Sequence, residues 1–182
     1  QALSSGTYDW TLMSFLLRAN YNFDYRYYLT FSIRADGSSK FPKANRWGIF
    51  PSASVAWNFN REGNLKDARW LSNGKLRFSW GQTGNNRTST PHDYYAQYSR
   101  DIVSGHTLDY VNNNAIAPGY YPSNMQNDDL RWETTEQLDL GLDLGFFDNR
   151  IKVTADLYLK NTYDLLLNAT IPSSSGFKTQ ML

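Results

Sequence analysis

The sequence predicts an all-β fold built on an antiparallel sheet. Three observations support this prediction. Apolar and polar residues alternate with a period of two in about six segments, as in strands with one apolar face. The period of an amphipathic helix is almost absent. Short turns and longer loops alternate along the chain, apart from residues 61–74, as in strands that run up and down. We expect strands near residues 8–23, 27–36, 48–60, 75–83, 133–147 and 150–168.

The first two strands are expected to form a hairpin. Odd-numbered residues from Met13 to Phe23 are apolar, and Leu16 alone breaks the alternation. In the second strand the odd-numbered residues are again the apolar ones. The loop between them must then hold an odd number of residues for the apolar faces to coincide, and Asp24-Tyr25-Arg26 meets that condition.

The later strands continue the same apolar face. The third carries Ile49, Ala53, Val55, Trp57 and Phe59, and the fourth carries Leu76, Phe78 and Trp80. In the fifth strand leucines alternate with polar residues and glycines, and in the sixth the odd-numbered residues from Ile151 to Leu159 are apolar. A two-residue loop at Asp148-Asn149 pairs Phe147 with Arg150, sets Asp143 opposite Thr154 and aligns the two apolar faces.

A soluble sheet with one buried face would also alternate, so the membrane has to be inferred from other features. The longest apolar runs, such as Leu165 to Leu167, are too short for a transmembrane helix. Aromatic residues end the apolar rows at the rim with the short turns, as in an interfacial girdle. They are Tyr21, Phe23, Tyr27, Trp57, Phe59 and Phe146. We therefore expect a segment of a transmembrane β-barrel in a bacterial outer membrane.

The opposite face carries charges well inside the strands, as a water-filled or plugged lumen allows. The residues expected to face the lumen are Arg18, Arg34, Arg77, Asp139, Asp143, Lys152 and Asp156. Residues 84–132 are expected to form a long, irregular extracellular loop, since such a loop is rare in a compact soluble domain unless it has a function. Its candidates for contact with a substrate or partner are Tyr94, Tyr95, Tyr120 and Tyr121.

No catalytic, cofactor or metal site is predicted. Asp139 and Asp143 lie roughly 13 Å apart along a strand, too far for paired-carboxylate glycoside chemistry, so we expect them to be salt-bridge partners in the lumen. Glu133 and Glu136 fall on opposite faces. The segment Asp36-Gly37-Ser38-Ser39 is explained as a turn, Gly81-Gln82-Thr83-Gly84 lacks the Gly-Lys-Ser/Thr of a phosphate loop, and His92 and His106 have no neighbouring cluster. The absence of cysteine excludes disulfides and thiolate metal sites, and a net charge of +1 gives no sign of nucleic acid binding.

Several strings resemble the SusC/RagA family of TonB-dependent transporters, in matching order and spacing across nearly the whole chain. They are Ile33-Arg34-Ala35-Asp36-Gly37-Ser38-Ser39-Lys40-Phe41, Asn45-Arg46-Trp47-Gly48, Phe50-Pro51-Ser52, Lys75-Leu76-Arg77, Gly81-Gln82-Thr83-Gly84-Asn85, Leu130-Arg131-Trp132-Glu133-Thr134-Thr135-Glu136-Gln137 and Asp164-Leu165-Leu166-Leu167 before Ile171-Pro172. The resemblance implies a large barrel with an N-terminal plug, capped by a SusD-like surface lipoprotein. It also implies that the barrel imports glycan or peptide fragments with energy from the TonB complex.

On this resemblance residues 1–182 are part of a barrel of about 22 strands. The plug domain, the segment that contacts TonB and the remaining strands are then absent from the sequence, and outer-membrane lipid is the surrounding medium. Two other interpretations stay open. One is a complete small outer-membrane barrel with a structural or adhesion role, since about 8 strands can close. The other is a soluble carbohydrate-binding β module that uses the four loop tyrosines as stacking platforms.

Overall fold

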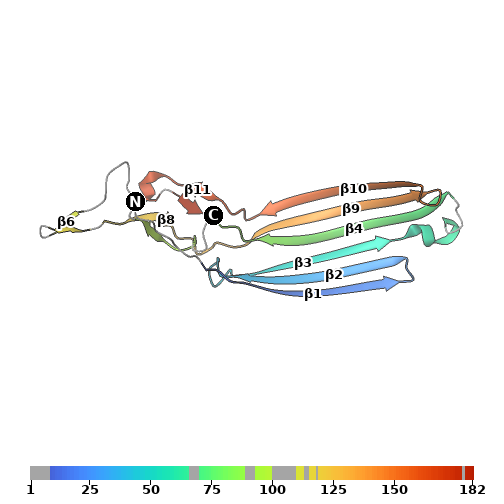
Figure 1. Ribbon diagram of the computed structural model, residues 1–182, viewed down its shortest axis with the longest axis horizontal. Coiled ribbons are helices and arrows are strands. Elements are labelled where there is room, and N and C mark those ends of the chain that lie inside the picture. The colour runs from blue at the N-terminus through green and yellow to red at the C-terminus, as the bar shows by residue number, and fades with distance from the viewer. Residues whose placement is uncertain are drawn as a thin grey trace, which may run out of the picture.

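The computed structural model describes residues 9–65, 70–88, 93–99, 110–112, 115–117, 119–177 and 179–182. Its main body is a six-stranded sheet with the order β1-β2-β3-β4-β9-β10, in which every neighbouring pair is antiparallel (Figure 1). These strands are β1 (Leu12–Phe23), β2 (Tyr27–Ser38), β3 (Trp47–Trp57), β4 (Leu71–Asn85), β9 (Glu133–Phe146) and β10 (Ile151–Tyr163). The predicted all-β fold and its long antiparallel strands are confirmed.

The two short turns set the register that alternation predicted. Phe23 pairs with Tyr27 across the first turn, and Phe146 pairs with Ile151 across the second. Asp24 and Tyr25 have φ near 51° and 52°, in the left-handed region that tight turns use. The second turn is longer than predicted because Phe147 also has a positive φ of 50°. The register is nonetheless the predicted one, with Asp143 opposite Thr154.

Four predicted strand boundaries are wrong by three or more residues. β1 begins at Leu12 and not near residue 8, and β4 begins at Leu71 and not at residue 75, while two strands end early for local reasons. The third strand ends at Trp57 because a 3₁₀ turn, η1 (Phe59–Arg61), follows it, and η2 (Gly63–Leu65) comes next. The sixth strand ends at Tyr163 because Asp164 has a φ of 52°, which an extended strand cannot accommodate. Within the described ranges, no helix is long and apolar enough to cross a membrane.

The segment 84–132 is more ordered than the irregular loop predicted from the sequence. It contains β5 (Gln97–Ser99), β6 (Tyr110–Asn112), β7 (Ala115–Ala117) and β8 (Tyr121–Met125). After β10 the chain continues through β11 (Asn168–Thr170), the 3₁₀ turn η3 (Ser173–Ser175) and β12 (Thr179–Met181). A second sheet with the order β11-β12-β8-β5 joins these two parts of the chain, and β12 runs parallel to β8. Strands of three to five residues are too short for an alternation to be detected.

The buried core lies where these loops meet the polar face at the end opposite the short turns (Figure 1). Its members come from the loop after β2, from β3, from the segments before β5 and between β8 and β9, and from β12: Phe41, Phe50, Tyr94, Leu130, Trp132 and Met181. The Trp132 ring contacts those of Phe41 and Phe50 at 5.2 and 5.6 Å, and its Nε1 donates a hydrogen bond to the Arg46 carbonyl at 3.0 Å. Among the described residues, this buried cluster forms a small globular cap at the loop end of the long sheet.

Candidate functional site

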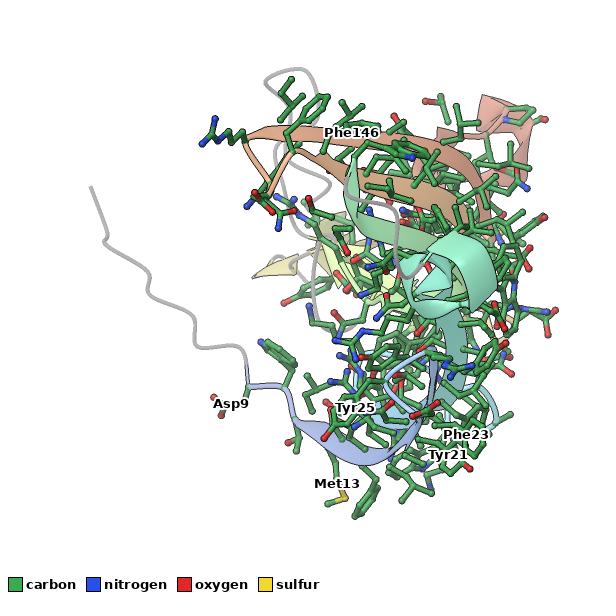
Figure 2. All side chains as sticks on the ribbon, turned by 90° about the vertical axis from the view of Figure 1, so that its right-hand side faces the viewer. Asp9, Met13, Tyr21, Phe23, Tyr25 and Phe146 are labelled. Carbon is green, nitrogen blue, oxygen red and sulfur yellow. The ribbon has the colours of Figure 1, made fainter. Side chains whose placement is uncertain are left out.

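The six-stranded sheet has one continuous apolar face. The strand registers place Leu17 beside Ile33, Val55 beside Phe78, and Leu140 beside Leu157. These side chains are exposed to a degree unusual for leucine in a soluble protein, with Leu17 at 65% and Leu157 at 71%. Figure 2 shows the sheet as a curve, with Met13 and Phe146 on its outer side. An apolar face of this size without a covering layer needs an apolar medium.

Aromatic rings border the apolar face at both ends. The predicted girdle lies at the short turns, where Trp57 and Phe59 are in edge contact at 5.8 Å and Trp70 stacks on Phe146. A second row, which the sequence interpretation missed, lies near the loops and includes the stacked pair Phe15 and Trp47. The sequence contains a signal for this second row, because Trp47 is the first residue of β3 and Trp57 is the last.

The separation of the two aromatic rows fits the thickness of a membrane. Trp47 and Trp57 are the first and last residues of β3 and lie on the same face of the sheet. Ten residue steps at about 3.3 Å span about 33 Å along a strand. A tilt of about 40°, usual for outer-membrane barrels, reduces that to about 25 Å, which is the height of their apolar band.

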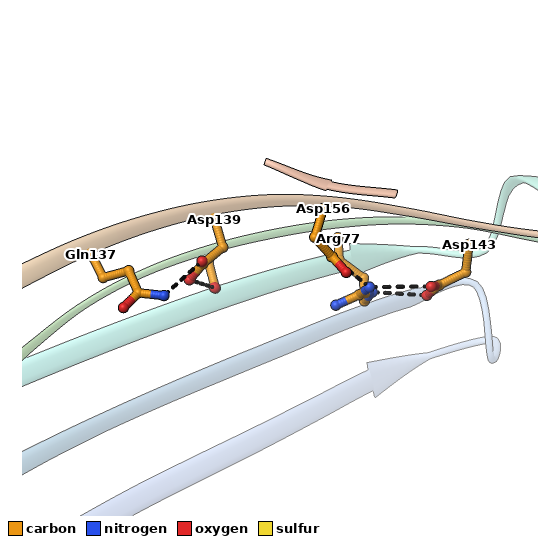
Figure 3. A network of polar contacts seen from close by, with 6 residues as sticks. Arg77, Gln137, Asp139, Asp143 and Asp156 are labelled. Carbon is orange, nitrogen blue, oxygen red and sulfur yellow. Dashed lines mark hydrogen bonds and ion pairs between the residues drawn. The ribbon is translucent and has the colours of Figure 1, made fainter. Parts of the chain in front are cut away.

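The other face of the sheet is polar, and its centre is an ion-pair network that crosses three strands (Figure 3). Arg77 on β4 donates two hydrogen bonds to Asp143 on β9, from Nε at 2.8 Å and from Nη2 at 3.1 Å. The same Nη2 reaches Asp156 on β10 at 2.9 Å. The three side chains stay between 25% and 54% exposed, so water screens the charges. The network therefore links the three strands but contributes little to the free energy of folding.

Gly141 provides the space through which Arg77 reaches Asp156. This glycine lies on β9 and pairs with Arg77 on one side and with Asp156 on the other. A Cβ at this position would lie 2.6 Å from the Asp156 Oδ1 and 2.7 Å from the Arg77 Cζ. Only a residue without a side chain lets the bridge pass over the middle strand.

We expect Gly141→Ala to break the contact between Arg77 and Asp156, because the Cβ and the guanidinium cannot share that space. A double-mutant cycle of Gly141→Ala with Asp156→Asn, measured by urea unfolding, should give a coupling energy of about 0.5 to 1 kcal/mol. Strict additivity of the two substitutions would contradict this role.

The remaining candidates on the polar face have different partners. Arg34 pairs with Asp36 at 2.6 Å, and the Asp36 side chain is buried. Asp139 was expected to be a salt-bridge partner, but it accepts hydrogen bonds from the Ser79 hydroxyl and the Gln137 amide instead. Arg18 and Lys152 make no ion pair within the described part of the chain. Among the described residues, the salt-bridge expectation is therefore met by Asp143 and not by Asp139.

A groove of about 490 Å³ opens on the polar face toward the loop end. Arg18, Arg34 and Asp139 line it together with Leu16, which breaks the alternation of β1, and with Phe50 of the core. Within the described ranges no three His, Cys, Asp or Glu side chains gather as metal ligands. His92 and His106 lie outside the described residues. The groove thus offers cations, a carboxylate and hydroxyls for hydrogen bonding.

The loop tyrosines have unlike environments. Tyr94 is buried in the core, and its ring lies 4.0 Å from that of Tyr95, which is half exposed. Burial, with a smaller effect from the hydrogen bond to Tyr95, raises the pKa of Tyr94 to about 12. Tyr120 is exposed, and the Tyr121 side chain lies outside what is described. Tyr95 and Tyr120 are therefore the better placed of these candidates for contact, which stays a prediction.

The single-layer sheet, its exposed apolar face with an aromatic row at either end and its charged reverse define a wall segment of an outer-membrane β-barrel. A family model described as "TonB dependent receptor-like, beta-barrel" matches residues 4–180. The chain belongs to this family, and its place is the bacterial outer membrane.

The similar proteins are all receptors or transporters of this class, and one of the solved structures is named as a peptide transporter. The TonB-dependent receptor P3 of Formosa agariphila is 39% identical over 93% of this chain, and the TonB-dependent receptor SusC of Bacteroides thetaiotaomicron is 38% identical over 94%. A solved structure of the RagAB peptide transporter superposes with a TM-score of 0.80 at 32% identity over 94% of the chain. The chain spans only 16 to 18% of the length of these proteins.

These findings decide between the interpretations left open by the sequence. In the described residues β1 and β10 are the two borders of the sheet and do not pair with each other, so the six strands do not close and the small complete barrel is wrong. Family membership contradicts the soluble carbohydrate-binding module. Proteins of this family are receptors and transporters, and the chain is not an enzyme.

Proposed function

We propose that this chain forms part of the wall of an outer-membrane importer that takes up oligosaccharides or peptides with energy from the TonB complex. One observation carries the proposal: an open sheet with a lipid-suited face and a charged face superposes on the RagAB peptide transporter with a TM-score of 0.80. A SusD-like surface lipoprotein would deliver the solute, and the relatedness to SusC supports that partner.

In this proposal the polar face lines the lumen. Arg18, Arg34, Arg77, Asp139, Asp143, Lys152 and Asp156 then face water, the plug or the passing solute. The unpaired borders of β1 and β10 would be completed by further barrel strands, because lipid cannot satisfy free backbone N–H and C=O groups. The TonB complex would act through a plug domain.

Growth of a strain that lacks the gene tests the proposed function. The strain should fail on a peptide mixture or on an oligosaccharide as sole nutrient, and the full-length gene should restore growth. Normal growth of the deletion strain on every peptide and glycan source that the wild type uses would contradict an importer of this class.

The orientation of the chain in the membrane can be tested separately. We expect residues 84–132 to be extracellular and to contact the lipoprotein or its cargo. A specific protease site inserted after Tyr120, which is exposed, should be cut on intact cells lacking the lipoprotein, whereas the same site inserted after Asp148 should be cut only after lysis. Cleavage after Asp148 from outside would reverse the topology.

A further inference from the structure

A carboxylate lies at the end of the apolar face beside the short turns. The Tyr27 hydroxyl donates a hydrogen bond to Glu62 Oε1 at 2.8 Å, and the Trp57 Nε1 donates one to Oε2 at 2.9 Å. Tyr27 and Trp57 are register partners on β2 and β3, and both belong to the outward aromatic row. Glu62, which follows η1, is thus fixed at the depth where that row meets the membrane surface.

The charge of Glu62 is not neutralised within the described residues. Both donors are neutral, and a carboxylate has about four acceptor positions, so about half of them stay open. Of the described cations near it, Arg26 pairs with Asp24 at 2.9 Å and Arg61 lies over the Tyr25 ring at 5.7 Å. A negative charge with free acceptor positions at this depth favours a cation from the surroundings.

The carboxylate borders a hollow of about 600 Å³ whose other walls are apolar. Trp57, Phe59 and Leu65 line it with Glu62 and Gly63. The Phe59 ring packs directly over Gly74 of β4, in space that any side chain at this position would occupy. Aromatic faces beside a carboxylate attract an ammonium group through both cation–π and ionic contacts.

We propose that this hollow binds the ammonium headgroup of an aminophospholipid, phosphatidylethanolamine, in the adjoining leaflet. Its primary ammonium donates up to three hydrogen bonds and can use the open positions on Glu62 while lying against Trp57. Phosphatidylglycerol has no cation and would bring a second negative charge to the carboxylate. The inference is independent of the solute that the barrel transports.

The test uses the full-length protein in vesicles made of equal parts phosphatidylethanolamine and phosphatidylglycerol. After extraction into mild detergent, native mass spectrometry gives the ratio of the two lipids that stay bound. We expect Glu62→Gln, which keeps the size and one acceptor oxygen, to lower the ratio of bound phosphatidylethanolamine to phosphatidylglycerol about fivefold, the weight of one exposed ion pair. Heat-modifiable gel mobility checks that the variant is folded.

Glu136→Gln is the matched control. Glu136 also accepts a hydrogen bond from an indole, that of Trp80 at 2.6 Å, but it lies toward the loop end of the sheet. We expect its substitution to leave the lipid ratio unchanged. An unchanged ratio in Glu62→Gln would overturn the proposal, and so would an equal fall in both variants, because the preference would then reflect surface charge in general.

Discussion

Leu142→Arg is expected to cost about 2 to 4 kcal/mol of folding free energy, because it would place a cation on the lipid-facing side near the middle of the membrane. Leu142 lies on the apolar face of β9, beside Leu76 on β4 and Ala155 on β10. The girdle residue Phe146 lies four positions further along the strand, roughly 13 Å away. Urea titration of the full-length protein folded into vesicles measures the loss.

The sheet offers matched controls for this prediction on another strand. Leu16 and Leu17 are neighbours on β1 but lie on opposite faces, and both are more than 60% exposed. Leu17→Arg should behave like Leu142→Arg, whereas Leu16→Arg should cost far less, since Leu16 lines the polar groove. On β9 itself, Asp143→Asn should fold normally, because the amide keeps an acceptor for Arg77. Equal damage from substitutions on both faces would contradict the assignment of the lipid-facing side.

Trp132→Ala should open the cap at the loop end without unfolding the long sheet. Trp132 is 6% exposed and contacts Phe41 and Phe50, so its removal leaves a cavity that costs about 3 to 5 kcal/mol. Amides that hold the second sheet together, such as Leu167 and Leu182, which bond to each other's carbonyls, should exchange at least about 100-fold faster. Hydrogen exchange of the full-length protein, read by mass spectrometry, reports both regions at once.

Two comparisons make the result specific. Tyr120→Ala removes an exposed ring from the same loop and should leave these exchange rates unchanged. Peptides from the short-turn ends of β1 and β2, near Phe23 and Tyr27 and far from the cap, should keep their protection in the Trp132 variant. Fast exchange throughout the long sheet would show that the cap and the sheet unfold together, contrary to the prediction.

The long strands could be predicted from the sequence because apolar and polar residues alternate in each of them, over about ten residues in all but the fourth, with the apolar residues on one face. The requirement that these faces coincide fixed the register of both short hairpins, as Asp143 opposite Thr154 shows. The charges of the polar face could be predicted by the same reasoning, since a residue's parity along a strand decides its face. The aromatic row at the short turns followed from the strand ends.

The partners of those charges were decided only by the tertiary structure. Arg77 reaches Asp156 across a whole strand, and this requires the missing side chain of Gly141, which no single strand's pattern reveals. Asp139 takes neutral partners because Ser79 and Gln137 lie within reach.

The loops show the same division. The pairing of β8 with β12 joins segments more than fifty residues apart, and Met181 of β12 shares one buried cluster with Tyr94 and Trp132. Alternation is a local pattern that is visible in the sequence itself. Contacts between distant loops instead depend on which surfaces the folded sheet brings together. By itself the sequence therefore determined the strands, their faces and their short turns, and the tertiary structure decided the ion pairs, the cap and the position of Glu62.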